Sequence, residues 1–352
     1  MDGYERLRGN ERFSLGEHAV DRGIDRRRHG RGVKYEGDGG VFSQTWWPIC
    51  HSSDVGPSGV IGRDFLDGRV AVFRNESGAV SVVSAYCPHN GADLSLGCVR
   101  GEHLQCRFHR WEFDGGGQCI KTGSGDKVPP RARVFKYPTV ERYGLIWAFN
   151  GETPLFDLPS LGGPDEDYVF HPNIPTVDIN ADPWVFMCNT LDFNHIRCVH
   201  GVEFGRDPVD QVRWEQYGYR YHLDGYIRES NLKVQYDVGI TGTNIFQQTG
   251  EAFGHWFGFL YPAGIHRPGT MRCYTLIYTR KSNGTPEDDA RVKAALDFGM
   301  NLELKIVEED LDILNSIRFT RGTFTASDRG LGQWLDFLDR YPRAHPGADY
   351  IR

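Results

Sequence analysis

The chain has 352 residues, 39% of them hydrophobic, and a formal net charge of −7. This length is sufficient for two domains, and the negative charge argues against a general nucleic-acid-binding role. The sequence contains no apolar run long enough to span a membrane and no apolar signal core near Met1. A cytoplasmic protein without a membrane span is therefore expected.

Residues 1–40 are polar, charged and rich in glycine. The basic run over residues 26–31 could suggest an anionic partner, but a solvated terminal segment is the simpler interpretation. We expect a loose lead-in with at most one short helix.

From Trp46 onward the sequence predicts short strands joined by tight turns, such as Asp67-Gly68 and Ser77-Gly78. Many short strands with such turns are typical of a small antiparallel β domain. We place this domain at residues 41–152, and the Pro/Gly-rich stretch 154–164 predicts a linker after it.

Four metal-ligand side chains lie on two expected loops of this domain. Cys87 and His89 are followed, after sixteen intervening residues, by Cys106 and His109. A [2Fe–2S] cluster in which two His replace two Cys on one iron requires this ligand set. Zinc is the alternative, because it also binds Cys2His2 sites. Zinc fingers, however, group the two Cys and the two His separately, so the alternating order favours the cluster.

The remaining cysteines are predicted to be reduced, because a long chain without a signal peptide rarely carries a disulfide framework. We expect them to be small buried residues. Cys198 lies between two candidate metal ligands, and a packing role is favoured for it as well. The six are Cys50, Cys98, Cys119, Cys188, Cys198 and Cys273.

The second half of the chain predicts a broad antiparallel sheet and a long helix. Alternating segments predict strands, whereas residues 287–319 have helical spacing. The predicted strands cover residues 217–227, 233–239, 254–261 and 270–280. These elements indicate an α+β protein.

A second possible metal site contains Asp192, His195 and His200. Five residues turn an α-helix so that the two imidazoles point about 140° apart. Both can reach one ion only if the helix is distorted or ends between them. On spacing alone, a metal site and two unrelated histidines both remain open.

Asp310 is the candidate third ligand. It falls within an apolar stripe that includes Ile306, Ile313 and Ile317, and a carboxylate on a buried helix face is costly unless it is paired or binds a metal. An ordinary buried ion pair is the alternative. The neighbouring acidic residues are expected to face solvent; they are Glu308, Glu309 and Asp312.

The segments 87–97 and 104–114 resemble the Rieske domain of the Rieske non-haem iron oxygenases. The resemblance implies an α+β fold: a small antiparallel β Rieske domain over residues 41–152 and a helix-grip catalytic domain over 153–352, on which the lead-in packs. Arg107 departs from the family, which usually has Pro there. This departure leaves the rigidity of the loop and the potential of the cluster open.

The resemblance also implies roles for residues of the second site. His195, His200 and Asp310 would hold Fe(II) as a facial triad with positions open for O2. Asp192 would bond a cluster histidine, His109 by its loop position, across the subunit boundary of a head-to-tail homotrimer. A helix-capping or surface carboxylate is the alternative for Asp192. Asn189 matches a family position near the iron.

The activity so implied is that of a terminal oxygenase. It would perform an O2-dependent hydroxylation or related monooxygenation of a small, cyclic or aromatic organic substrate. Electrons would come from NAD(P)H through a separate ferredoxin or flavin-dependent reductase, because the chain has no dinucleotide-binding fingerprint. Arene cis-dihydroxylation and a pure Rieske electron carrier are the alternatives. Four apolar residues are candidate pocket walls, with a place in the core as the equal alternative: Phe193, Phe204, Ile240 and Phe246.

Overall fold

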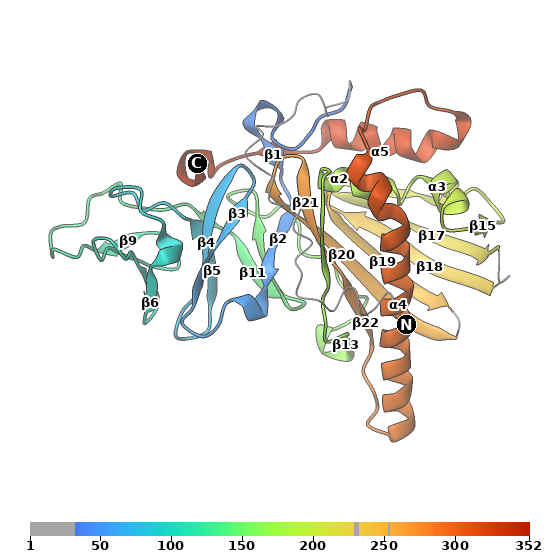
Figure 1. Cartoon of the computed structure of the whole chain (residues 1–352), viewed down its shortest axis with the longest axis horizontal. Helices are drawn as coiled ribbons and strands as arrows, with labels where there is room; N and C mark the ends of the chain where they lie inside the picture. The colour runs from blue at the N-terminus through green and yellow to red at the C-terminus, as the bar shows by residue number, and fades with distance from the viewer. Residues whose placement is uncertain (1–31, 229–231, 253) are drawn as a thin grey trace.

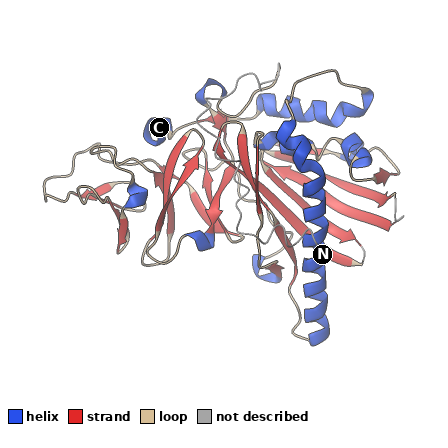
Figure 2. Ribbon diagram, in the orientation of Figure 1, coloured by secondary structure: helices blue, strands red, loops and turns tan. Residues whose placement is uncertain are grey.

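The computed structural model describes residues 32–228, 232–252 and 254–352. Most of the expected lead-in, residues 1–31, lies outside these ranges. A β-rich body forms one side of the molecule, and a broad sheet crossed by a long helix forms the other (Figures 1 and 2). We call them the β domain and the helix-grip domain.

The β domain contains three small antiparallel sheets. Two of them pack around a core, and the third forms a tip at the far end (Figure 1). In the first, β10 (Lys136–Tyr137), β5 (Val80–Ser84), β4 (Gly68–Arg74) and β3 (Val60–Phe65) are neighbours in that order; the second contains β11 (Thr139–Arg142), β12 (Leu145–Phe149) and β2 (Trp46–His51). The tip consists of β6 (Cys98–Arg100), β7 (His103–Gln105), β8 (Glu112–Phe113) and β9 (Cys119–Lys121).

The helix-grip domain is built on one large antiparallel sheet, with the strand order β13-β22-β20-β19-β18-β17-β15. Helix α4 (Pro286–Ser316) lies across it and packs on β20 and β22 (Figure 1). The predicted α+β fold is therefore confirmed. The strands are β13 (Tyr168–Phe170), β15 (Val202–Phe204), β17 (Gly218–Ile227), β18 (Leu232–Thr241), β19 (Ile245–Ala252), β20 (His255–Arg267) and β22 (Leu276–Arg280), with β14 (Thr176–Ile179), β16 (Arg213–Glu215) and β21 (Thr270–Tyr274) attached.

Two details differ from the sequence prediction. The segment 270–280 is two strands that separate at Thr275, where β21 pairs with β14 and β22 pairs with β13. The predicted helix over 287–319 ends at Ser316. Further helices are α2 (Pro183–Cys188), α3 (Phe193–Cys198) and α5 (Arg329–Arg340).

The two domains share a hydrophobic core. Trp46 and Trp147 of the β domain pack in one cluster with Leu260 and Tyr278 of the large sheet. The buried Asn244 amide connects the domains further, because its nitrogen donates to the Trp46 and Ala263 carbonyls. The relative placement of the domains is thus fixed by packing as well as by hydrogen bonds.

The C-terminal segment returns to the β domain. Strand β23 (Arg343–Ala344) pairs with β1 (Phe42–Ser43), and the short helix α6 (Ala348–Ile351) buries Ile351 completely in the β-domain core. The predicted catalytic domain at 153–352 was therefore wrong for its last residues. The pairing with β1 joins positions about 300 residues apart, which no local pattern reveals.

The described end of the lead-in packs on the helix-grip domain. Tyr35 is buried in that domain's core, and its hydroxyl donates to the Phe319 carbonyl at 2.6 Å. The backbone N–H of Glu36 donates to Asp182.

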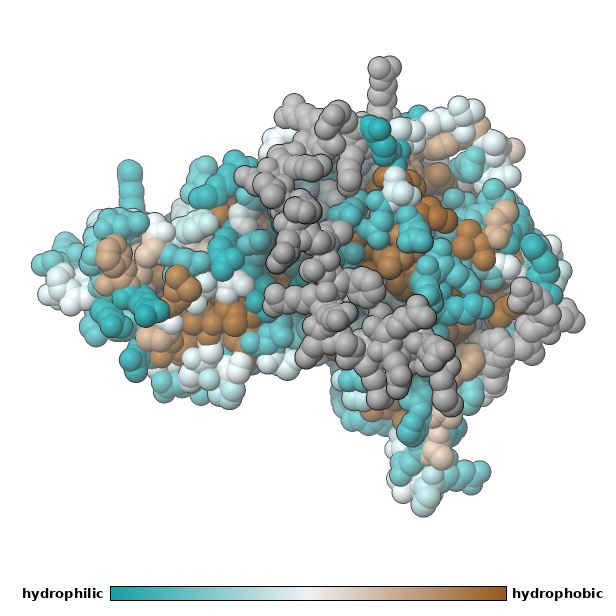
Figure 3. Space-filling view, in the orientation of Figure 1, coloured by the Kyte–Doolittle hydropathy of each residue, from teal (hydrophilic) through white to brown (hydrophobic). Residues whose placement is uncertain are grey.

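The surface combines hydrophilic areas with apolar patches, some of them on the arm formed by the β domain (Figure 3). The large apolar side chains exposed in this domain are Leu96, Phe108 and Ile120. Within the described ranges, no helix is long and apolar enough to cross a membrane.

Candidate functional site

Two loops at the tip of the β domain carry the first candidate centre, and they have the same backbone construction. In one, the Cys87 N–H donates to the Ala92 carbonyl and the Gly91 N–H donates to the Cys87 carbonyl. In the other, the Cys106 N–H donates to the Trp111 carbonyl and the Arg110 N–H donates to the Cys106 carbonyl. Gly91 and Arg110, four residues after each Cys, both have positive φ, at 72° and 59°. Each loop therefore presents one Cys and one His from an equivalent turn.

The four donor side chains differ in burial. Cys87 and Cys106 are buried, whereas His89 and His109 are exposed and their ring centroids lie 4.6 Å apart. A hydrogen bond between the two sulfurs raises the pKa of Cys87 and lowers that of Cys106, so the thiols are in direct contact. The arrangement fits a cluster with a buried thiolate-bound iron and an outer imidazole-bound iron. Trp111 stacks on His89 at 4.5 Å and fixes its ring plane.

The second candidate centre begins at α3. Asp192 caps this helix, because its carboxylate accepts a hydrogen bond from the His195 N–H. The helix ends at Cys198, and Gly201 follows His200 with φ of 65°. The helix thus ends between the two histidines, which is one of the two conditions that their spacing demanded. Their Nε2 atoms face each other at 3.0 Å.

Asp310 completes the group from α4. Its Oδ1 lies 3.4 Å from His195 Nε2 and 3.5 Å from His200 Nε2. Three ligand atoms bound at about 2.1 Å and at right angles would lie about 3 Å apart. Burial opposes ionisation of Asp310, but the two imidazoles lower its pKa overall.

Asp310 Oδ1 is buried and has no hydrogen-bond partner. A buried carboxylate oxygen without a partner is costly, and a cation among these three side chains would satisfy it. The donor set of two imidazoles and one carboxylate suits Fe(II) with open coordination positions. The residues therefore fit the metal that the sequence implied.

Two further side chains orient these groups. The Asn189 amide donates to Asp310 Oδ2 at 2.9 Å, which leaves Oδ1 facing the histidines. Glu309 Oε2 lies 3.0 Å from His200 Nδ1. If Nδ1 carries the proton, His200 Nε2 has its lone pair free for a metal. Burial lowers the pKa of His200, but Asp310 and Glu309 more than offset this and raise it overall.

Glu309 is exposed, as predicted, but it also contacts His200, which the sequence analysis did not foresee. The signal that sequence analysis missed was general: a metal-binding histidine usually donates its second N–H to a carboxylate. Asn189, in contrast, lies where the resemblance suggested.

The apolar stripe used to select Asp310 was also wrong. Ile313 and Ile317 are 50% and 37% exposed. The buried face of α4 runs through other positions, spaced by three or four residues, and Asp310 belongs to this face. Its members include Leu296, Met300, Glu303, Asp310 and Leu314.

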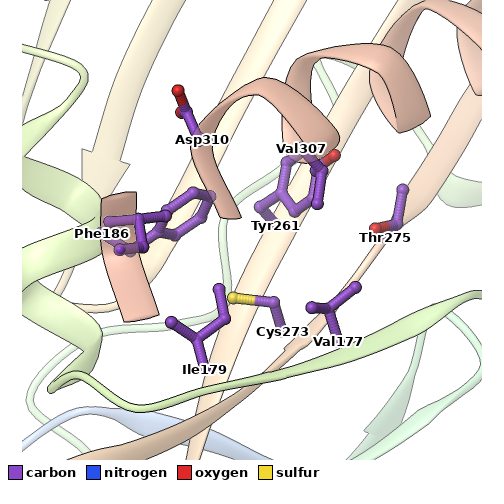
Figure 4. A pocket seen from close by; sticks show the side chains of 9 residues that line it. Val177, Ile179, Phe186, Tyr261, Cys273, Thr275, Val307 and Asp310 are labelled. Atoms are coloured by element: carbon purple, nitrogen blue, oxygen red, sulfur yellow. The ribbon is translucent and has the colours of Figure 1, made fainter. Parts of the chain in front are cut away.

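A small cavity lies beside Asp310, between α4 and the sheet, and has room for about one water molecule. Figure 4 shows Asp310 and Phe186 at one end of the lining side chains and Thr275 at the other. None of the four candidate walls lines this cavity, and the alternative, a place in or against the core, holds for all of them. Ile240 is fully buried in the core, and Phe193 packs against Tyr221.

The other cysteines are free thiols, and four of them are buried. Cys198 is exposed, which contradicts the predicted packing role. It lies on the last turn of the short helix α3, and its Sγ approaches Asn194 Oδ1 at 3.8 Å. Cys98 is only partly buried.

A β domain with paired Cys–His loops, joined to a helix-grip domain with a two-histidine, one-carboxylate group, defines a class of oxygenases. The chain matches the Rieske [2Fe-2S] domain over residues 45–138. It is 34% identical over 286 residues to a 4beta-methylsterol monooxygenase of Methylococcus capsulatus, covering 71% of this chain and 70% of that protein. The chain belongs to the Rieske non-haem iron oxygenases.

Two other similarities extend this comparison. The oxygenase component of dicamba O-demethylase from Stenotrophomonas maltophilia is 34% identical over 180 residues, or 50% of this chain and 52% of that protein. The chain thus spans about half the length of some relatives that it matches. The crystal structure of dicamba monooxygenase bound to dicamba has the same fold, with a TM-score of 0.63 at 19% identity over 85% of this chain and 97% of that one.

Proposed function

We propose that the chain is the terminal oxygenase component of a Rieske monooxygenase system. It would use O2 to hydroxylate, or remove a methyl group from, a small and mainly apolar organic substrate. The observation that carries the proposal is the convergence of His195, His200 and Asp310 around a buried, unpartnered carboxylate oxygen. A protein that only carries electrons has no need of this second group.

The chain's own residues divide the work. Cys87, His89, Cys106 and His109 would hold the [2Fe–2S] cluster, and the three converging side chains would hold Fe(II). When bound, the iron would supply open positions for O2 and the cluster would supply electrons. Asn189 and Glu309 hold the carboxylate and the imidazole of the iron site in place. The apolar side chains that line the small cavity beside Asp310 would border a substrate next to the iron and exclude water from it.

We further propose a head-to-tail homotrimer. The loops of the cluster tip and helix α3 lie on opposite sides of the molecule (Figure 1), so electrons would pass between them most directly across a subunit boundary. Asp192 would bridge that boundary to His109. Asp192 Oδ1 caps α3, which leaves its second oxygen to accept a hydrogen bond from a partner. The exposed Leu96 and Phe108 on the tip would be covered in such an assembly.

The electrons would come from NAD(P)H through a ferredoxin, a flavin-dependent reductase, or both. A cytoplasmic location stays a prediction from the sequence. Arene cis-dihydroxylation is the second candidate activity, because the same ligand set supports it.

The experiment starts from the anaerobically reconstituted protein. Iron is counted per chain for the wild type, for His195→Ala and for the control His222→Ala, whose imidazole is exposed and bonded to Asp237. We expect one iron beyond the cluster in the wild type and in the control, and its loss in His195→Ala.

The reduced protein then receives labelled O2 for a single turnover. The first compounds are dicamba and a 4-methylsterol, which the names of the relatives suggest. One labelled oxygen in the product, or loss of a methyl group, would support the monooxygenase. Two labelled oxygens would instead establish dihydroxylation, and cluster iron alone with no product would establish an electron carrier.

A further inference from the structure

A groove of about 240 Å³ lies on the helix-grip domain, apart from both candidate centres. It runs between the end of β16, the turn that follows β16 and the C-terminal end of α5. A cavity of about 150 Å³ is enough to hold benzene, so this groove has room for one ring and a substituent. None of the described residues that line it belongs to the cluster loops or to the iron site. They include Trp214, Glu215, Phe337, Arg340 and Tyr341.

Aromatic rings form much of the wall, and their neighbours hold them in place. Trp214 is 37% exposed, its ring centroid lies 5.3 Å from that of Phe337, and its indole N–H donates to Gln333 at 3.4 Å. The Phe337 and Tyr341 ring centroids also lie 5.3 Å apart. The Tyr341 hydroxyl donates to the Gln44 carbonyl, so only its ring is left for a ligand. A wall of rings that are already positioned favours a flat aromatic ligand.

Arg340 is the cation of the groove, and it forms no ion pair with any residue that the structure describes. Asp336 and Asp339, the acidic residues nearest to it along α5, both pair with Arg321 instead. The helix dipole stabilises a cation at the end of α5, but it leaves the guanidinium N–H donors of Arg340 free. A guanidinium with free donors is suited to a carboxylate, which it can bind with two parallel hydrogen bonds.

Glu215 limits the charge that a ligand can carry. It is exposed, lines the same groove and likewise has no ion-pair partner within the described ranges. A ligand with two negative charges would bring the second one toward this carboxylate, and like charges repel. A single carboxylate is therefore favoured over a dicarboxylate or a phosphate dianion.

We propose that this groove binds a one-ring aromatic compound that carries a single carboxylate. The ring would lie against Trp214 and Phe337, and the carboxylate would accept hydrogen bonds from the Arg340 guanidinium. The compound would be held without being oxidised there, since no candidate iron ligand lines the groove. The inference goes beyond the proposed oxygenase function and does not depend on it, because this binding requires neither metal centre.

The test measures binding without turnover. Phenylacetate, its methyl ester, cyclohexylacetate and phenethylamine are titrated by calorimetry into the anaerobic, iron-loaded protein with an oxidised cluster. The titrations are repeated with His195→Ala, because a carboxylate could also bind iron at the triad. The groove variants are Arg340→Gln, Arg340→Lys and Trp214→Leu. Arg131→Gln is the matched control, since Arg131 is exposed on the β domain and does not line the groove. The visible spectrum of the cluster checks the folding of every variant.

We expect the wild type, His195→Ala and Arg131→Gln to bind phenylacetate about fivefold more tightly than its methyl ester, the size of one exposed ion pair. Arg340→Gln should lose this preference, and Arg340→Lys should keep part of it. The wild type should also bind phenylacetate about threefold more tightly than cyclohexylacetate, a difference that Trp214→Leu should lose.

Four results would overturn the proposal. They are equal binding of acid and ester by the wild type, an unchanged preference in Arg340→Gln, failure of all four compounds to bind, and tightest binding of phenethylamine, which would make Glu215 the anchor. Binding of phenylacetate that disappears in His195→Ala would place the carboxylate at the triad and overturn it as well. Neither the presence nor the absence of the groove's preference bears on whether the triad holds iron, so the oxygenase proposal is tested separately.

Discussion

Replacing Glu309 by Gln should weaken iron binding although Glu309 is not a proposed ligand. The substitution keeps the size of the side chain but removes the charge that faces His200 Nδ1 at 3.0 Å. Losing such a supporting carboxylate typically costs about 10–100-fold in metal affinity. The Glu309 side chain is 33% exposed, so solvent screens its charge, and a glutamine oxygen can still accept from Nδ1. We therefore expect Glu309→Gln to lose Fe(II) affinity by the low end of this range, about tenfold or 1.4 kcal/mol.

The assay is an anaerobic competition between the protein and a chelator for Fe(II), with the cluster intact. Glu308→Gln is the control, because it removes an equal charge one residue away on the exposed surface of α4. An affinity in Glu309→Gln within about twofold of that control would refute the argument that the carboxylate prepares His200 for the metal.

Asp192→Ala should retain both metal centres but nearly abolish coupled turnover, and loss of the α3 cap should lower the free energy of unfolding by about 1 kcal/mol. Asp192→Asn keeps a capping oxygen but removes the charge, and normal turnover in both variants would exclude the bridging role. Cys198→Ser should leave iron content and turnover unchanged, because this thiol is exposed, whereas a loss of iron would make it a ligand. Gly91→Ala should lower cluster loading, measured from the visible spectrum, because φ of 72° strains any other residue by about 1–2 kcal/mol. Burial raises the pKa of Asp182 from 3.8 to about 7, so the folded state keeps a proton that the unfolded state loses, and stability falls as pH rises between these values. The melting temperature of the wild type should therefore fall over this pH range and that of Asp182→Asn should not; parallel pH profiles of the two proteins would contradict the assignment.

The sequence was most informative where chemistry dictates a local pattern. The cluster donors follow from two short motifs. The spacing of His195 and His200 required either a distorted helix or a helix end, and the structure has the helix end, at Cys198. Asp310 was selected through a stripe containing Ile313, which is exposed. The selection held because a carboxylate is costly on whichever face of α4 is buried.

The supporting groups could not be predicted in the same way. Glu309 matters because α4 places it against His200, more than 100 residues earlier in the chain. Such partners are determined by how helix and sheet pack, and single-sequence periodicity carries no information on that packing.

The return of residues 343–351 to the β domain changes how the protein can be divided for engineering. The helix-grip domain is an insert between two parts of the other domain, since β23 pairs with β1 and Ile351 fills the core around Phe42. A fragment ending near residue 152 would lack part of its own interior. Exchanging the substrate-binding unit between relatives therefore requires two junctions, one on each side of the insert, and the C-terminal segment must stay with the cluster.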